Sequence, residues 1–314
     1  DVADAIESCH HAGVRVIMAT GDQGDTAEAI GREVGIAGGH SFHGHALEGI
    51  EDASDDRRRE LLEGRIFYRV SPADKLNLIS LHQEAGDIVA MTGDGVNDAP
   101  ALEKADIGVA MGQRGEEVAE DAADIVLRDD RFPTIVMAIR HGRIIFDNIR
   151  RFVIYLISGN VAEILIVTLA NFLGGTMPLL PLQILYLNAI NDVFPALALG
   201  LGEGGSDIMD RPPRDPAEPI LAGRHWGSIA GYGLLLAGSV LAGFVIGREV
   251  LGFSGPEAVT VSFLSIALGR LWHVFNMRDA DSPIFVNPVT RNAYVWMALL
   301  LSVVLILGAA YITP

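Results

Sequence analysis

The stretch from Thr92 to Asp98 carries two carboxylates, Asp94 and Asp98, that are separated by glycine, valine and asparagine. It follows an apolar run, residues 87–91, that has the pattern of a buried strand. Mg²⁺ in proteins is usually bound by one or two carboxylates together with phosphate oxygens, and glycine lets the backbone come close to an anion. The segment therefore predicts a magnesium and phosphate site, although an ordinary turn after a strand would use the same residue types.

Two shorter motifs precede this segment. Thr20, Gly21 and Asp22 follow the apolar strand pattern at 14–18. Lys75 ends the segment Arg-Val-Ser-Pro-Ala-Asp-Lys. A lysine after a proline is usually a surface residue at a helix start. Lys75 is therefore a candidate functional residue only because of its place in an ordered set of motifs.

The first 132 residues predict an α/β domain, because apolar strand patterns alternate with helical patterns at 26–34 and 75–83. The strand patterns lie at 14–18, 66–70, 88–91, 107–110 and 125–127. A doubly wound parallel sheet is the expected arrangement, and ligands in such sheets bind at the carboxyl ends of the strands, where Thr20, Gly21, Asp22, Asp94 and Asp98 fall. The charged run at 51–60 is expected to be a solvated helix or loop.

Half of the residues are hydrophobic, yet the formal net charge is −17. The charges lie mostly in the first 147 residues, and the part after Ile149 contains long apolar runs. We predict five membrane-spanning helices, at about 152–173, 179–199, 226–246, 259–275 and 293–312. Buried helices of a globular protein are the alternative, and five such runs in succession argue against them. The lipid bilayer is therefore an expected partner.

The placement of arginine predicts which side of the membrane each link faces. If residues 1–147 are cytosolic, the links at 200–225 and 276–292 are cytosolic too, and they contain Arg211, Arg214, Arg224, Arg278 and Arg291. The outer links contain only Arg248, as the positive-inside rule requires. The acidic excess argues against nucleic acid as a partner. The single cysteine, Cys9, excludes an intramolecular disulfide.

Polar side chains interrupt two of the predicted spans. A charged side chain at the centre of a span costs about 2.5 to 3.5 kcal/mol on insertion scales, so each is a candidate functional residue. Glu163 lies one helical turn from Asn160, and Asp192 lies one turn from Asn188, with Asn191 beside it. Two carboxylates and three amide oxygens from adjacent helices could form an oxygen cage for a hard cation. Hydrogen bonding between helices is the alternative.

The segment Thr-Gly-Asp-Gly-Val-Asn-Asp-Ala-Pro-Ala-Leu at 92–102 resembles the hinge signature of P-type cation-transporting ATPases almost letter for letter. Residues 19–22, 69–75 and 206–214 resemble, in the right order, the second phosphate-binding motif, the lysine motif and the loop after the sixth membrane helix of the calcium and sodium pump branch. The resemblance covers essentially the whole chain. It implies a haloacid-dehalogenase-like (Rossmann-like) partial α/β domain at 1–132, followed by an all-α transmembrane bundle at 133–314.

The resemblance also implies roles for the matching residues. ATP hydrolysis with Mg²⁺ would drive transport of a cation, most simply Ca²⁺, across the cytoplasmic membrane. Asp94 is then expected at the Mg²⁺ site as a ligand, with Asp98 and Asn97 holding its geometry. Thr20 and the Gly21 amide, in the motif that ends at Asp22, would bind the transferred phosphoryl group, whose charge Lys75 would neutralise.

In the membrane half, the resemblance implies that the polar cluster binds the transported ion. Its members, Asn160, Glu163, Asn188, Asn191 and Asp192, match the ion-binding residues of the calcium-pump branch, except that Asn191 stands where a threonine is commoner. Arg270 falls near an expected Glu, Gln or Asp ligand, and a guanidinium cannot ligate a cation. It could pair with Glu163 or Asp192 as a fixed countercharge, which would suit fewer ions per cycle or proton pumping. It could equally extend to the cytosolic surface.

The chain also departs from the family's pattern. The nucleophilic Asp-Lys-Thr-Gly-Thr segment does not occur in it. The nucleotide-binding domain, the actuator domain and the first four membrane helices have no counterpart. We therefore expect the carboxyl-terminal part of a pump that is inactive alone, with the amino-terminal part as its missing partner. An H⁺ or Na⁺ pump, a membrane-bound phosphatase, and a non-catalytic regulatory protein with a pseudo-phosphorylation domain are the alternatives.

Residues 133–173 predict a single long helix, with an apolar stripe and a cationic cytosolic stalk. Such a rod would join the Asp94 site to Glu163. The loop at 207–213 is expected to brace it, or to be a proline-rich turn with no role beyond packing.

Overall fold

The computed structural model of the chain describes residues 1–36, 38–172, 176–205, 207–279 and 282–311. The predicted helix ends at 173 and 312, and residue 206 of the loop motif, lie outside the described residues. The chain divides into two compact units. The first comprises Asp1–His141 with Asp207–Pro216, and the second comprises Gly142–Ser206 with Ala217–Pro314. Each unit is described separately below.

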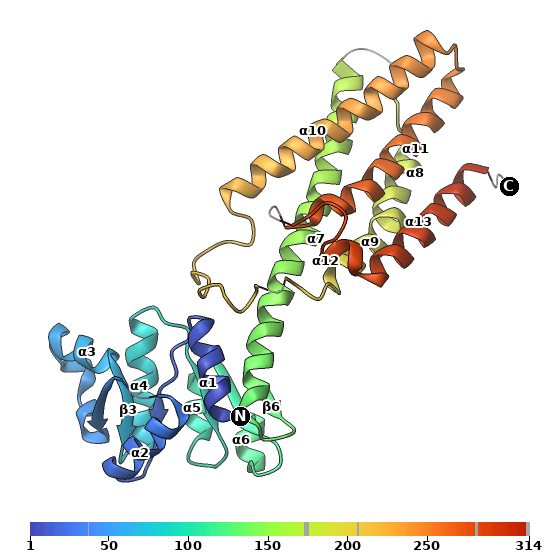
Figure 1. Ribbon diagram of the computed structural model, residues 1–314. Helices are drawn as coiled ribbons and strands as arrows, with labels where there is room; N and C mark the ends of the chain where they lie inside the picture. Colours follow the sequence, from blue (N-terminus) through green and yellow to red (C-terminus); the bar gives the residue numbers. More distant parts are fainter. Residues whose placement is uncertain (37, 173–175, 206, 280–281, 312–314) are drawn as a thin grey trace. The chain divides into compact units, whose positions relative to one another are not determined.

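Parallel strands form the centre of the first unit (Figure 1). One sheet has the order β1-β3-β2, from Met18–Ala19, Gly64–Tyr68 and His40–His43, and the other has the order β4-β5-β6, from Ala90–Gly93, Ile107–Met111 and Ile125–Leu127. All four strand pairs are parallel, as predicted. The expected single sheet is divided in two, because no strand pairing among the described residues joins the two sets of strands.

Helices connect and cover these strands. They are α1 (Val2–His11), α2 (Gly24–Val34), α3 (Asp55–Leu62), α4 (Pro72–Glu84), α5 (Ala99–Lys104) and α6 (Glu117–Ala122), with short 3₁₀ turns at Gly44–Leu47 and Ile50–Asp52. The charged run at 51–60 therefore forms a 3₁₀ turn and most of α3. Burial of Leu61, Phe67 and Leu81 in one apolar cluster, and of Leu102 and Ala110 in another, holds the helices on the sheets.

The second unit is entirely helical apart from its links. The helix α7 (Phe132–Phe172) begins in the first unit and continues through the second as one uninterrupted element, as predicted. It is followed by α8 (Pro181–Tyr186), a π-helical turn (Leu187–Asn191), α9 (Val193–Gly200), α10 (Gly223–Val245) with a second π-helical segment (Ile246–Val250), α11 (Gly255–His273) with a 3₁₀ turn (Val274–Met277), α12 (Pro288–Arg291) and α13 (Ala293–Tyr311).

Five of the described helical segments are long and apolar enough to cross a membrane: Phe132–Phe172, Pro181–Gly200, Gly223–Val250, Gly255–Met277 and Ala293–Tyr311. Leucines on their outer faces are strongly exposed, with Leu235 and Leu300 each at 69%. Such faces are favourable in hydrocarbon, and the helices satisfy their own backbone hydrogen bonds there. The structure thus supports a multi-pass integral membrane protein.

Candidate phosphotransfer and cation sites

A capping box places Lys75 at the start of α4. The Ser71 side chain accepts a hydrogen bond from the Asp74 amide (3.2 Å), and the Asp74 carboxylate accepts one from the Ser71 amide (2.8 Å). Pro72 occupies the first turn, where its missing N–H costs nothing. The Ser-Pro-Ala-Asp-Lys sequence is therefore a helix-start motif, and it fixes Lys75 in the first turn, next to the carboxyl end of β3.

Lys75 meets the second carboxylate of the Asp94–Asp98 segment. The Lys75 Nζ lies 2.5 Å from Asp98 Oδ1, and both side chains are largely buried. Close packing holds the segment in place, because a Cβ on Gly93 would lie 2.5 Å from the Cβ of Asp98. This ion pair was not predicted from the sequence. The sequence shows the two motifs but not that they meet.

Backbone hydrogen bonds connect the first motif to the same edge. Val70 donates its N–H to Thr20 O, and Arg69 donates its N–H to Asp22 O, both at 3.0 Å. The Thr20 hydroxyl donates to the Asp22 carboxylate (3.1 Å). Since residues 69 and 70 lead directly into α4, the chain of contacts runs from the Thr20 motif through the start of α4 to Asp98. The Thr20–Asp22 and Asp94–Asp98 motifs lie at the carboxyl ends of parallel strands, as predicted.

The donor set at this edge fits Mg²⁺ in the way the ion is usually bound. Among the described residues, no group of three or more His, Cys, Asp or Glu side chains could hold a metal ion by itself. Mg²⁺ does not need one, because it takes one or two carboxylates and completes its shell with phosphate oxygens and water. Asp94 is exposed to solvent, whereas one Asp98 oxygen already binds Lys75. Asp94 is thus the carboxylate that is accessible to a metal–phosphate ligand.

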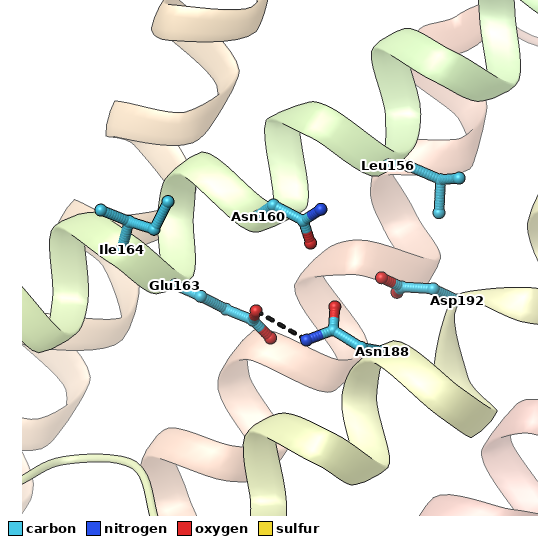
Figure 2. A pocket seen from close by; sticks show the side chains of 6 residues that line it. All are labelled: Leu156, Asn160, Glu163, Ile164, Asn188 and Asp192. Carbon is cyan, nitrogen blue, oxygen red and sulfur yellow. Dashed lines mark hydrogen bonds between the residues drawn. The ribbon is translucent and has the colours of Figure 1, made fainter. Parts of the chain in front are cut away.

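In the second unit, the polar residues predicted to bind the cation come together. Figure 2 shows Asn160 and Glu163 of α7 facing Asn188 and Asp192. These side chains line a pocket with a volume of about 530 Å³. Asn188 donates a hydrogen bond from Nδ2 to Glu163 Oε2 (3.0 Å). Glu163 and Asp192 are 6% and 2% exposed, within helices apolar enough to cross a membrane.

A π-helical turn positions the residues after α8. It covers Leu187–Asn191, and the Asp192 amide donates to Leu187 O over five residues rather than four. The wider turn changes the directions of Asn188 and Asn191 relative to an α-helix, and such turns are frequent at functional sites. This turn was not predicted from the sequence, because the apolar pattern here is too short to reveal it.

Arg270 of α11 lies inside the same cluster. Its Nη1 is 2.6 Å from Asp192 Oδ2 and its Nη2 is 3.2 Å from Glu163 Oε1. Its side chain is 1% exposed, so the first of the two predicted arrangements, pairing with the carboxylates, is present and the extension to the surface is not.

The cluster keeps unused hydrogen-bonding capacity. Within the described residues, Asp192 Oδ1 and Asn191 Oδ1 are buried and accept no hydrogen bond. Buried oxygens without donors are costly unless a ligand compensates them. An arrangement of this kind can bind a hard cation by its oxygens.

The α/β unit with its phosphate motifs, and the apolar helices with their buried carboxylates, define a haloacid dehalogenase-like domain joined to a multi-pass membrane bundle. Two families of haloacid dehalogenase-like hydrolases match residues 1–106 and 76–139. The family "Cation transporting ATPase, C-terminus" matches residues 176–314. The chain belongs to the P-type cation-transporting ATPases.

The chain is similar to several proteins that are named as calcium ATPases. A calcium-transporting ATPase of Bacillus subtilis is 39% identical over 317 residues, which cover 100% of this chain and 35% of that protein. One from Listeria monocytogenes is 39% identical over 304 residues (96% and 34%), and an endoplasmic reticulum calcium ATPase of Aspergillus fumigatus is 38% identical over 309 residues (93% and 30%). The chain thus spans about a third of the length of these relatives.

Proposed function

We propose that this chain is the carboxyl-terminal part of an ATP-driven cation pump that works through an aspartyl-phosphate intermediate. Ca²⁺ or another small hard cation is the proposed cargo, because the relatives are named calcium-transporting ATPases or calcium ATPases. The observation that carries the proposal is the pair of buried carboxylates, Glu163 and Asp192, on apolar helices. Arg270 offsets only one of these two negative charges, and the remaining buried charge is costly there unless it serves a charged ligand.

The proposed chemistry needs an aspartate from outside this chain. Its carboxylate attacks the γ-phosphorus of ATP, the bond to the β,γ-bridging oxygen breaks, and ADP leaves. Water then cleaves the acyl phosphate, which restores the carboxylate and releases inorganic phosphate. Thr20 and the Gly21 amide are proposed to bind the transferred group, and Lys75 to offset its charge. Because the sequence holds no Asp-Lys-Thr-Gly-Thr segment, we propose that the chain alone neither phosphorylates itself nor transports.

Mg²⁺ is proposed to bind at Asp94, with Asp98 and Asn97 fixing the geometry. When bound, the ion neutralises charge on the phosphate oxygens. The ion pair between Lys75 and Asp98 supports this division of roles, because it places a cation beside the exposed Asp94 segment while the Asp98 carboxylate holds the lysine in place. Asp22 orients Thr20 through their hydrogen bond.

In the membrane half, we propose that Glu163, Asp192 and the three asparagines bind the cargo. Arg270 then acts as a fixed countercharge. Its pairing with both carboxylates is the specific observation that favours fewer cations per cycle, or an H⁺ or Na⁺ pump, as the second candidate. Residues 1–147 are proposed to lie in the cytosol and the helices in the cytoplasmic membrane, on the arginine distribution.

The test is ATPase activity of the full-length gene product in purified membranes, against Ca²⁺, Mn²⁺, Na⁺, K⁺ and a pH series. Stimulation by one cation in the wild type, lost in Glu163→Gln, supports the proposal. The matched control is Glu249→Gln, because Glu249 is 69% exposed near the end of a predicted span. ATPase activity that no cation stimulates, and that Glu163→Gln does not change, would show that the carboxylate cluster is not a transport site.

A further inference from the structure

The guanidinium of Arg270 lies directly against Gly159 of α7. A Cβ added to Gly159 would lie 2.7 Å from Arg270 Cζ and Nη2, and 2.8 Å from Nε. Contacts between carbon atoms are favourable near 3.5–4.0 Å, so any side chain at this position overlaps with the guanidinium. The bare Cα of Gly159 provides the surface on which Arg270 rests.

The end of an arginine side chain would ordinarily move away from an added methyl group. Here it cannot do so at low cost, because Nη1 is held by Asp192 and Nη2 by Glu163. Moving the guanidinium by the distance that a methyl group requires separates at least one of these pairs. Separating a buried ion pair leaves an uncompensated charge, and a membrane makes that cost larger.

The position of Gly159 along α7 explains the arrangement. Gly159 and Glu163 are four residues apart, so they lie on the same face of the helix, one turn from each other. The small residue and the carboxylate therefore both face Arg270. A glycine inside a helix costs about 1 kcal/mol relative to alanine. Close packing of helix backbones is the usual reason for one in a membrane, yet the three nearest atoms here all belong to the Arg270 guanidinium.

We infer that Gly159 is a positioning residue that keeps Arg270 on both carboxylates of the cation cluster. The inference rests on the proposed function insofar as the cluster binds cargo. A larger residue at 159 displaces the positive charge from at least one of the two carboxylates. Because that charge repels an entering cation, its displacement strengthens cation binding. Gly159→Ala therefore acts in the same direction as removing the arginine.

The experiment is a double-mutant cycle in the full-length pump, with Gly159→Ala, Arg270→Ala and the combined variant. Gly231→Ala on α10 is the control, because nothing lies within 4 Å of a Cβ at that glycine. Two quantities are measured: the concentration of Ca²⁺ that gives half-maximal ATPase activity, and the midpoint of thermal unfolding in detergent. The second needs no transport, so it is informative even if the proposed function is wrong.

We expect Gly159→Ala to lower the half-maximal Ca²⁺ concentration by about tenfold, within the coupling range of residues in contact. The same substitution has no further effect in the Arg270→Ala background. It lowers the unfolding midpoint only while Arg270 is present. Equal effects in both backgrounds, or no effect in either, would overturn the inference.

Two failures remain distinguishable. If Ca²⁺ stimulates no variant, the proposed cargo is wrong and the unfolding midpoints decide the inference alone. If Arg270→Ala does not fold, the comparison of Gly159→Ala with Gly231→Ala decides it. The inference requires the first to lower the unfolding midpoint and the second not to, and similar midpoints contradict it.

Discussion

At the scale of single residues, the ion pair between Lys75 and Asp98 is the contact that brings two sequence motifs together. Lys75 comes from the start of α4, and Asp98 follows β4. The sequence predicted that both residues matter, because each belongs to a local motif. It did not predict that they meet, because no local pattern specifies a contact between residues 23 positions apart.

Replacing Lys75 with Met should destabilise the first unit by about 1 to 3 kcal/mol, because Asp98 is then buried without its donor. Hydrogen exchange of the α4 and α5 amides in the intact protein measures this change. The combined variant Lys75→Met/Asp98→Asn should recover most of the loss. Lys104→Met, at an exposed position, is the control. Equal protection in Lys75→Met and the control would contradict the structural role given to the pair.

His82 makes the stability of the first unit depend on pH. Burial lowers its pKa below the ordinary value of 6.5, although its hydrogen bond to Asp87 opposes the shift. Below about pH 6.5 the unfolded chain therefore binds a proton that the folded chain does not, and stability falls as the pH decreases towards the folded pKa. We expect the unfolding midpoint to fall less steeply with decreasing pH in His82→Gln than in the wild type.

The control for this pH dependence is His10→Gln, since His10 is exposed on α1. It should retain the wild-type slope of unfolding midpoint against pH. Identical slopes in wild type and His82→Gln would mean that other groups cause any acid sensitivity.

At the scale of elements, α7 is the element best suited to couple ATP hydrolysis to cation transport. This single 41-residue helix begins in the first unit and carries Glu163. Within the second unit, its buried Asn148 donates from Nδ2 to Gly200 O (3.2 Å) and Gly202 O (2.7 Å). These bonds tie α7 to the carboxyl end of α9, which follows Asp192. Pro213 of the loop at 207–213 packs on Gly13 within the first unit. This contact does not test whether the loop braces α7, so that bracing stays a prediction.

Breaking α7 should uncouple ATP hydrolysis from transport in the full-length pump. Ile145→Pro removes a helix hydrogen bond and kinks the helix at a cost of about 3 kcal/mol or more. We expect ATP hydrolysis to persist while the number of cations moved per ATP falls. Ile145→Ala, which keeps the helix at the same 56% exposed position, is the control. An unchanged ratio in Ile145→Pro would show that α7 does not transmit the coupling.

Among the elements that the sequence did not predict, two were missed for clear physical reasons. The strand β2, His40–His43, contains two histidines and a serine and is only partly buried, so it lacks the apolar pattern of a strand. The π-helical turn at Leu187–Asn191 differs from an α-helix by one residue in its hydrogen bonding, which no apolar periodicity of this length resolves. Long apolar helices such as α13 were predicted nearly to the residue, because length alone identifies them.

At the scale of the whole molecule, the sequence predicted two parts with different solvents, and the structure has two compact units. The sequence did not predict which side chains of different helices contact one another. The location of Arg270 depends on three helices at once, and the contact between Arg270 and Gly159 depends on which faces of α7 and α11 meet. Residue types restrict such contacts but do not determine them.

Glu163 and Asp192 are proposed to bind the transported cation. Uptake of radiolabelled Ca²⁺ by sealed membrane vesicles containing the full-length pump is the direct test. We expect ATP-dependent uptake in the wild type and in Glu249→Gln, and its loss in both Glu163→Gln and Asp192→Asn. Uptake by Glu163→Gln and Asp192→Asn at wild-type rate and affinity would contradict it.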